Sequence, residues 1–420
     1  MTQRKIHYFD NNATTRVAPD VIEAMAPFFA DFWGNPSSAY GFGHQVAKHV
    51  EEARAKVAAL INADPKEIVF TSCGTESNNA ALHSALVTHP GKRHIVTTAV
   101  EHSANINFCQ FLQKQGFDAT FLPVESDGSL DLHLLEKSIR PDTALVSVMW
   151  ANNETGVLFP IEEVAAICHS KGVLFHTDAV QTPGKLAIDV KALDVDFLSL
   201  SAHKLHAPKG IGLLYVKRRT RFQPYVIGGH QERGRRGGTE NVAFIVGFGC
   251  AAELAMAHLP EENTRVRGLR DRMETTLLRT IPKTMRNGAK EPRLPNTSNI
   301  AFDSAEAEAI LLLLDKAGIC ASSGSACTTG SLEPSHVLTA MGIGSTRARS
   351  CIRFSLGIYN SDEEVDYLLQ HLPAIIAKLR AVSPSDSSPS HYPSPGLEPV
   401  HGSHAARSGG ALKNPETTPA

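Results

Sequence analysis

The chain has 420 residues, with 41 basic and 43 acidic side chains and a formal net charge of −2. This length allows two domains with a sizeable core, and the balanced charge excludes an overall field that would hold nucleic acid or an anionic membrane. The opening "MTQRKIHYFDNNATT" lacks the apolar core of a signal peptide. We also expect that no stretch comes close to the roughly 18 apolar residues of a membrane span, and that the protein is cytoplasmic. Seven cysteines without regular spacing predict reduced thiols and no zinc site.

Apolar, β-rich runs alternate with helix-period segments through the first half of the chain. The helical segments are residues 76–87, 104–114 and 160–170, the last opening with a proline. The strand-like runs are residues 67–72, 94–98, 119–124, 144–150, 173–179, 197–204 and 210–216. Such alternation predicts an α/β fold in which a mainly parallel, seven-stranded sheet lies between helices.

The pattern changes beyond residue 241, where long helical segments precede short strands. The predicted helices are residues 241–259, 263–280 and 305–318, and the predicted strands are residues 297–302 and 351–357. This mixture of helices and strands predicts a smaller α+β domain. We expect an N-terminal segment at 1–15 that packs with this small domain, a large domain at 16–258, and the small domain at 259–381. The Pro- and Ser-rich residues 382–420 predict a disordered tail.

Lys204 ends an apolar strand in "SLSAHKLHAPKG", residues 199–210. Burying an unpaired ammonium group is costly, so a lysine at a strand end makes sense when its amine is held covalently as an imine. The alternative is a lysine whose charged end reaches solvent.

Two other strand ends carry residues of the same site. Asp178 ends the fifth predicted strand and Gln181 follows it, in the crevice where open α/β sheets bind ligands. A carboxylate there can pair with the protonated pyridine nitrogen of a cofactor, although a helix N-cap is the simpler interpretation. After the first strand, Gly74 and Thr75 open a helix whose N–H groups can hold a phosphate. Together these strand ends predict one cofactor site.

The motifs of the chain resemble those of the NifS/IscS-type cysteine desulfurases, pyridoxal-phosphate enzymes of fold type I in the class V aminotransferase family. The likeness covers residues 6–375 and is greatest to the NifS branch associated with nitrogen fixation. It rests on "YFDNNATT", "GNPSSAYGFG", "FTSCGTESNN", "VEHSA", "WANNETG", "HTDAVQ", "SAHKLHAPKG", "GGHQERGRRGGTEN", "SSGSACTTGSLEPSHVL" and "IRFSLG".

The resemblance implies pyridoxal 5'-phosphate bound as a Schiff base on Lys204, which also serves as a base toward the substrate. Asp178 would pair with the pyridinium and Gln181 with the phenolic oxygen, and His102 would be a catalytic residue that stacks on the ring and moves protons. The phosphate would lie on Gly74, Thr75, Ser201 and His203, with Thr239 contributed by the other subunit of a homodimer.

The resemblance also implies the substrate, L-cysteine, and the residues that bind it. Arg353 would grip the substrate carboxylate, with Asn153 beside the cofactor and Asn35 nearby. Taken alone, Arg353 is compatible with a surface charge at a strand edge.

Cys327, in "SSGSACTTG", lies among glycines and small hydroxyl residues. It would attack the substrate sulfur, carry it as a persulfide on a mobile loop, and deliver it to an iron–sulfur scaffold protein, in the nitrogen-fixation branch for nitrogenase maturation. The resemblance leaves open a transient iron–sulfur contact at Cys327 and implies no other metal. The remaining cysteines are expected to be packing residues, with Cys73 the one rival nucleophile.

Three alternatives share these features. A selenocysteine lyase or an aminotransferase-like relative could use the same cofactor site, but neither needs a cysteine on a long loop. A non-enzymatic scaffold for iron–sulfur assembly would keep the fold and lose Lys204, which is present.

Overall fold

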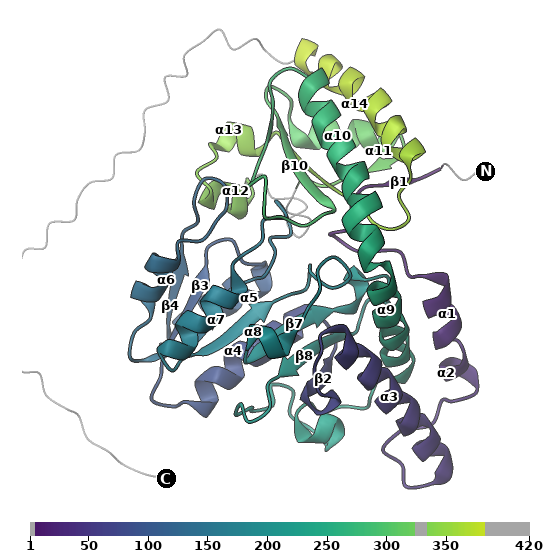
Figure 1. Cartoon of the computed structure of the whole chain (residues 1–420), viewed down its shortest axis with the longest axis vertical. Helices are drawn as coiled ribbons and strands as arrows, with labels where there is room; N and C mark the ends of the chain where they lie inside the picture. The colour runs from purple at the N-terminus through teal and green to yellow at the C-terminus, as the bar shows by residue number, and fades with distance from the viewer. Residues whose placement is uncertain (1–4, 324–333, 383–420) are drawn as a thin grey trace, which may run out of the picture. The chain divides into compact units, whose positions relative to one another are not determined.

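A seven-stranded sheet organises the first part of the chain in the computed structural model, which describes residues 5–323 and 334–382 (Figure 1). The order of the strands across the sheet is β2-β8-β7-β6-β5-β3-β4. Only β8 runs antiparallel to its neighbours, so the predicted mainly parallel sheet is confirmed. The strands are β2 (Ile68–Thr71), β3 (His94–Thr98), β4 (Asp118–Leu122), β5 (Thr143–Ser147), β6 (Leu174–Asp178), β7 (Phe197–Ser201) and β8 (Gly212–Val216).

Successive residues along the central strands enter two different apolar cores. Leu145 packs in a core with α4 (Gly74–Thr88) and α5 (Ser103–Lys114), whereas Val146 joins a core on the opposite face. The second core includes residues of α3 (Gly41–Leu60), α6 (Leu132–Ser138), α7 (Ile161–Ser170), α8 (Val190–Leu193) and α9 (Val242–Glu261). Helices on both faces explain why these strands are continuously apolar in the sequence.

The predicted helices are present, with small differences at their ends. Residues 76–87, 104–114 and 160–170 correspond to α4, α5 and α7, and Pro160 is the N-cap of α7 instead of its first residue. The sequence interpretation did not identify α1 (Pro19–Met25), α2 (Pro27–Ala30) or α3 near the N-terminus. Short helical turns complete the first part at η1 (Pro65–Glu67), η2 (Ala202–Lys204) and η3 (Gln231–Gly234).

A smaller antiparallel sheet follows, in the order β12-β10-β9. Its apolar core takes Phe9 from the N-terminal segment, where β1 (His7–Tyr8) pairs in parallel with β11 (Ile319–Cys320). The predicted domain boundaries remain predictions, and the predicted tail lies outside the described residues apart from Val382. The other elements here are β9 (Thr284–Arg286), β10 (Thr297–Phe302), β12 (Cys351–Ser355), α10 (Arg267–Thr280), α11 (Ala307–Lys316), α12 (His336–Ala340), α13 (Ser345–Ala348) and α14 (Asp362–Val382).

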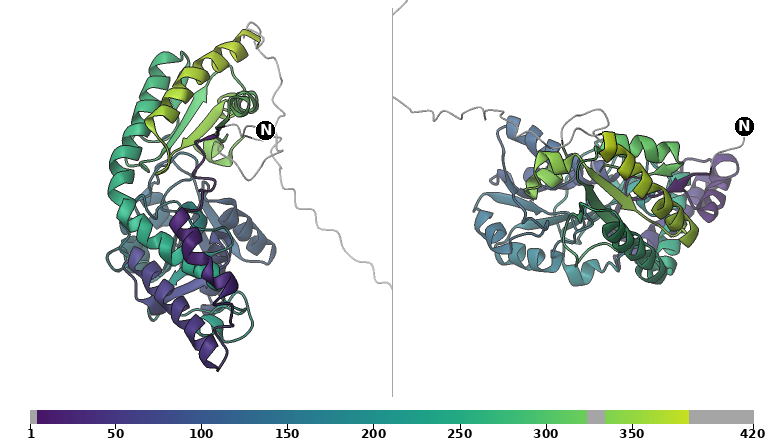
Figure 2. Two further views of the ribbon diagram at one scale, coloured as in Figure 1. Left: turned by 90° about the vertical axis from the view of Figure 1, so that its right-hand side faces the viewer. Right: turned by 90° about the horizontal axis from the view of Figure 1, so that it is seen from above.

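One helical stretch links the two sheets. α9 continues through a π-helical turn, η4 (Glu262–Val266), into α10. Figure 1 and the left view of Figure 2 show this stretch passing from α3 to the smaller sheet. Among the described residues, Val242–Thr280 is the helix long and apolar enough to cross a membrane, contrary to the expectation that no stretch comes close. A core helix passes the same test, and 44% of the apolar window is buried.

A Cβ on Gly249 would lie 2.9 Å from Ala53 Cα, which shows how closely α9 packs on α3.

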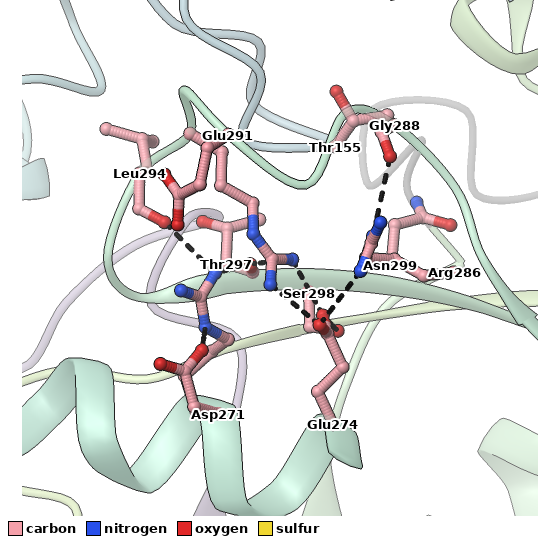
Figure 3. A network of polar contacts seen from close by, with 12 residues as sticks. Thr155, Asp271, Glu274, Arg286, Gly288, Glu291, Leu294, Thr297, Ser298 and Asn299 are labelled. Carbon is pink, nitrogen blue, oxygen red and sulfur yellow. Dashed lines mark hydrogen bonds and ion pairs between the residues drawn. The ribbon is translucent and has the colours of Figure 1, made fainter. Parts of the chain in front are cut away.

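A buried polar network joins α10 to the smaller sheet (Figure 3). Glu274 accepts two hydrogen bonds from Arg293, at 2.6 and 2.7 Å, and one from Ser298 at 2.7 Å. Burial alone would raise the pKa of Glu274, but the hydrogen bond and charge of Arg293 bring this pKa below its usual value. The carboxylate therefore stays ionised inside the fold, fully occupied by structural partners.

Candidate functional site

A cavity of about 520 Å³ lies at the carboxyl ends of the parallel strands. It collects residues from most of the predicted motifs, which are far apart in the sequence. The predicted site residues that line the cavity are Gly74, Thr75, His102, Asn153, Asp178, Gln181, Ser201, His203, Lys204 and Arg353. The location agrees with the rule that open α/β sheets bind ligands beyond the carboxyl ends of their strands.

Lys204 ends the short helical turn η2 directly after β7 and is half-buried. Its Nζ donates hydrogen bonds to the backbone carbonyls of Asn12 and Ala13, the second at 2.8 Å. Asn12 in turn receives a hydrogen bond from Gln181 on the same carbonyl, at 3.0 Å. The N-terminal segment thus holds the lysine amine at the cavity.

Asp178 is the last residue of β6 and is 6% exposed. One carboxylate oxygen accepts a hydrogen bond from Asn78 Nδ2 at 2.7 Å, and the other accepts one from the backbone N–H of Val180 at 3.0 Å. Asp178 is not a helix N-cap, so the simpler interpretation of this residue is wrong. Two donors instead fix a buried carboxylate at the cavity wall.

The turn between β2 and α4 forms another part of the cavity wall. The N-cap residue of α4, Cys73, gives no side-chain hydrogen bond to the first helical turn, so the positive helix end faces the cavity uncapped. A Cβ on Gly74 would lie 2.8 Å from Val180 Cγ2, so a larger residue would not fit there. The uncapped helix end and the close packing at Gly74 make this turn suitable for binding an anion.

His203 and His102 contribute two neutral imidazoles. Burial and the nearby lysines lower the pKa of His203 to about 3, and its Nδ1 hydrogen-bonds to Thr14 Oγ1 at 3.1 Å. Burial, followed by the charge of Lys204, lowers the pKa of His102, although the charge of Asp178 opposes the shift. His102 is also the N-cap of α5, since its Nδ1 accepts from the N–H of Ala104 at 3.1 Å. Both rings are therefore uncharged near neutral pH.

Arg353 lies on β12 and is 1% exposed, so the surface-charge interpretation is wrong. Its Nη2 donates to Asp10 Oδ1 at 2.7 Å and its Nη1 to the backbone carbonyl of Asn153 at 3.0 Å. The guanidinium lines the same cavity as Lys204 and Asp178. A planar fork at this position suits a carboxylate ligand.

Two predicted site residues, Thr239 and Asn35, do not line this cavity in their own chain. Thr239 lines a separate cavity of about 220 Å³ with Ser72 and Arg236. Asn35 is exposed, and its Oδ1 accepts a hydrogen bond from the N–H of Ser37 at 2.9 Å. Cys327 lies outside the described residues, so its predicted position is not tested.

Five of the six described cysteines occupy the positions expected of packing residues, whereas Cys73, the rival nucleophile, lines the cavity as the N-cap of α4. Burial raises the pKa of Cys109, Cys168 and Cys351 to about 12, which makes them poor nucleophiles. Cys250 lies in α9 and Cys320 in β11, and burial raises the pKa of both. No group of three His, Cys, Asp or Glu side chains able to hold a metal ion occurs within residues 5–323 and 334–382.

Sequence reasoning missed three residues that hold the site together. Asn12 supports Lys204, Asn78 supports Asp178, and Asp10 pairs with Arg353. Asp10 and Asn12 stand in the quoted motif "YFDNNATT", and Asn78 in "FTSCGTESNN". Their presence in these motifs was the available signal, but nothing local in the sequence says which distant group each one contacts.

Comparisons with known proteins give the same picture over most of the chain. The model of the aminotransferase class-V family matches residues 7–368. A protein of Nostoc sp. named cysteine desulfurase is 56% identical over 377 residues, which cover 90% of this chain and 94% of that protein. The cysteine desulfurase NifS of Azotobacter vinelandii is 52% identical over 398 residues, covering 94% of this chain and 99% of that protein.

A solved structure described as a NifS-like protein superposes with a TM-score of 0.84 and 40% sequence identity, covering 89% of this chain and all of the other. The predicted fold type is therefore confirmed. The identity and coverage far exceed what a shared fold alone would produce. The chain belongs to the aminotransferase class-V family and, within it, to the cysteine desulfurases, enzymes that carry pyridoxal phosphate as a Schiff base on a lysine.

Proposed function

We propose that this enzyme converts L-cysteine to L-alanine and leaves the sulfur on Cys327. The overall step balances as L-cysteine plus the Cys327 thiol giving L-alanine plus a Cys327 persulfide. The substrate carbon–sulfur bond breaks, a sulfur–sulfur bond forms, and no external oxidant is needed. The observation that supports this proposal most directly is that Lys204, Asp178 and Arg353 line one cavity.

The residues of the cavity fit pyridoxal phosphate. Gly74 and Thr75, together with Ser201 and the neutral His203, would hold the phosphate. Asp178 is buried and held by two donors, so its carboxylate is in place to pair with a protonated ring nitrogen. When bound, the cofactor supplies an electron sink for bonds at the substrate α-carbon.

We assign the remaining roles to residues of the chain itself. Lys204 would carry the cofactor and then move the proton of the substrate α-carbon, held in place until then by Asn12 and Ala13. His102 would stack on the ring, and Gln181 would donate to its phenolic oxygen through the N–H not given to Asn12. Arg353 would grip the substrate carboxylate, with Asn153 beside it.

We further propose that the enzyme is a cytoplasmic homodimer whose two cavities each take Thr239 from the other subunit. Thr239 lies outside the Lys204 cavity of its own chain, which is compatible with a contact across a dimer interface. Asn35 would take part in binding the substrate. The sulfur acceptor would be an iron–sulfur scaffold protein, with nitrogenase maturation as the destination and a transient cluster contact at Cys327.

Mass spectrometry after brief exposure to L-cysteine tests the central claim. We expect one added sulfur atom on Cys327 and none in Lys204→Ala, which should also lose the visible absorption of the cofactor. Cys327→Ala should keep that absorption and lose sulfide release with a thiol reductant. Cys73→Ala is the matched control and should behave as the wild type.

Three outcomes would overturn parts of this proposal. Sulfide release at the wild-type rate by Cys327→Ala would refute the nucleophile. A wild type that turned over L-selenocysteine and not L-cysteine would favour the lyase alternative. A protein that bound no cofactor and catalysed neither reaction would favour the scaffold alternative.

A further inference from the structure

The ion pair between Arg353 and Asp10 joins two segments that are 343 residues apart in the chain. Arg353 is almost fully buried, and Asp10 has a side chain that is 17% exposed. Among the ion pairs of the described residues, Asp10 is the carboxylate that contacts this guanidinium, at 2.7 Å. A buried guanidinium requires a partner for its charge, and Asp10 provides it.

The backbone around Asp10 is fixed against the strand that carries Arg353. Asp10 forms an isolated β-bridge with Ser355, two residues beyond Arg353 on β12. The N–H of Ser355 donates to the carbonyl of Phe9 at 2.8 Å, and the N–H of Asn11 donates to the carbonyl of Ser355 at 3.0 Å. The Asp10 carboxylate therefore has little freedom to move away from the guanidinium.

Two acceptors on different nitrogens determine the orientation of the Arg353 group. Asp10 takes a hydrogen bond from Nη2, and the carbonyl of Asn153 takes one from Nη1. Because a guanidinium is planar, contacts at two of its nitrogens define the plane. A bidentate grip on a carboxylate depends on that plane, since both N–H···O bonds must form together.

We propose that Asp10 is a positioning residue for substrate recognition, which orients Arg353 for the α-carboxylate of the amino acid. This inference rests on the proposed role of Arg353. Asp10 acts before the substrate arrives, by holding the fork in its binding geometry and balancing its buried charge. A merely structural Asp10 would affect all ligands of the cavity alike, whereas a positioning residue affects only those with a carboxylate.

The test compares two ligands that differ by the carboxylate, L-alanine and ethylamine, titrated into the holoenzyme and followed by the visible absorption of the cofactor. Neither contains sulfur to transfer, so binding is measured without turnover. In Asp10→Ala we expect the affinity for L-alanine to fall about tenfold or more, with the affinity for ethylamine changed less than twofold. Asp10→Asn keeps an acceptor and loses the charge, and should lower the L-alanine affinity about threefold.

Two controls separate the possible failures. Asp20→Asn, in α1, changes an acidic residue of the N-terminal region that does not contact Arg353, and should bind both ligands as the wild type does. Arg353→Lys should lose most of the preference for L-alanine. If it keeps that preference, the proposed role of Arg353 fails and this inference fails with it.

If Arg353→Lys loses the preference but Asp10→Ala keeps it, only the role of Asp10 is overturned. Equal weakening of both ligands in Asp10→Ala would indicate a structural role and would also overturn it. If Asp10→Ala does not fold, Asp10→Asn decides the question, because an unchanged ratio of the two affinities in that variant contradicts the proposal.

Discussion

Two buried arginines of the smaller sheet region differ in what surrounds their guanidinium groups. Arg293 gives both Nη groups to Glu274, whose carboxylate also accepts from Ser298 and lies 3.5 Å from Arg286 (Figure 3). Among the described residues, Arg353 donates to Asp10 from Nη2 and to the backbone carbonyl of Asn153 from Nη1, at the wall of a large cavity. Both Nη groups of Arg293 are paired within the fold, whereas the guanidinium of Arg353 lines the cavity, where a ligand carboxylate can reach it.

A buried charge therefore does not by itself identify a functional site. Both arginines are at most 7% exposed, and both pair with a carboxylate. The two arginines differ in their position relative to the cavity, so substitutions at the two sites should have different effects. Loss of the Arg293 pair should reduce stability, and change at Arg353 should reduce substrate recognition.

The largest effect is expected for Glu274→Ala, which leaves the buried Arg293 without its charge partner. We expect the free energy of unfolding to fall by about 3–5 kcal/mol, because the desolvation cost of the guanidinium is no longer offset. Urea unfolding of the holoenzyme measures it. Arg272→Ala on the same helix is the control, since its ion pairs with Asp362 and Asp366 are exposed and should contribute less than about 1 kcal/mol. Equal losses in the two variants would contradict the comparison.

Arg353→Lys should reduce catalysis and leave the stability of the protein almost unchanged. Lysine keeps the positive charge beside Asp10 but cannot form two parallel hydrogen bonds to a carboxylate. We expect kcat/KM for L-cysteine to fall about 100-fold, with the free energy of unfolding changed by less than about 1 kcal/mol. Arg293→Lys is the matched control and should keep kcat/KM within about threefold while losing stability. A similar fall in kcat/KM for both variants would show that the two arginines are not functionally distinct.

The smallest effect is expected at a buried group of the seven-stranded sheet, His176, which has no part in the cavity. His176 hydrogen-bonds to Ser147 Oγ at 2.8 Å and Ser199 Oγ at 2.9 Å, and burial lowers its pKa to about 3. The unfolded state takes up a proton near pH 6.5 and the folded state does not, so stability is lost as the pH falls below about 6.5.

His176→Gln should remove this contribution to acid sensitivity. We expect the difference in unfolding free energy between wild type and variant to shrink by about 2 kcal/mol from pH 7.5 to pH 5. Urea unfolding at several pH values measures it, and a difference independent of pH would refute the assignment. His203 and His206 also have lowered pKa values and contribute to the acid sensitivity that remains in the variant.

Much of the fold was predictable because its signals are local. Seven apolar runs correspond to the seven strands of one sheet, and the strand-end residues Lys204 and Asp178 lie at one cavity as expected. Alternation of strands and helices and polar residues at strand ends are short-range patterns, which a single sequence displays directly. The helices α1 to α3 were missed because no strand-like runs alternate with them.

The sheet, the strand-end lysine and aspartate, and the likeness to cysteine desulfurases could all be predicted from the sequence. The partners that hold these groups became visible only in the folded chain: Asn12 for Lys204, Asn78 for Asp178 and Asp10 for Arg353. The tertiary structure also shows that Arg353 is buried at the cavity and that Thr239 and Asn35 lie elsewhere in their own chain. These contacts join residues 100 to 343 positions apart, and chain topology sets such pairings, whereas composition and periodicity report only on neighbours along the chain.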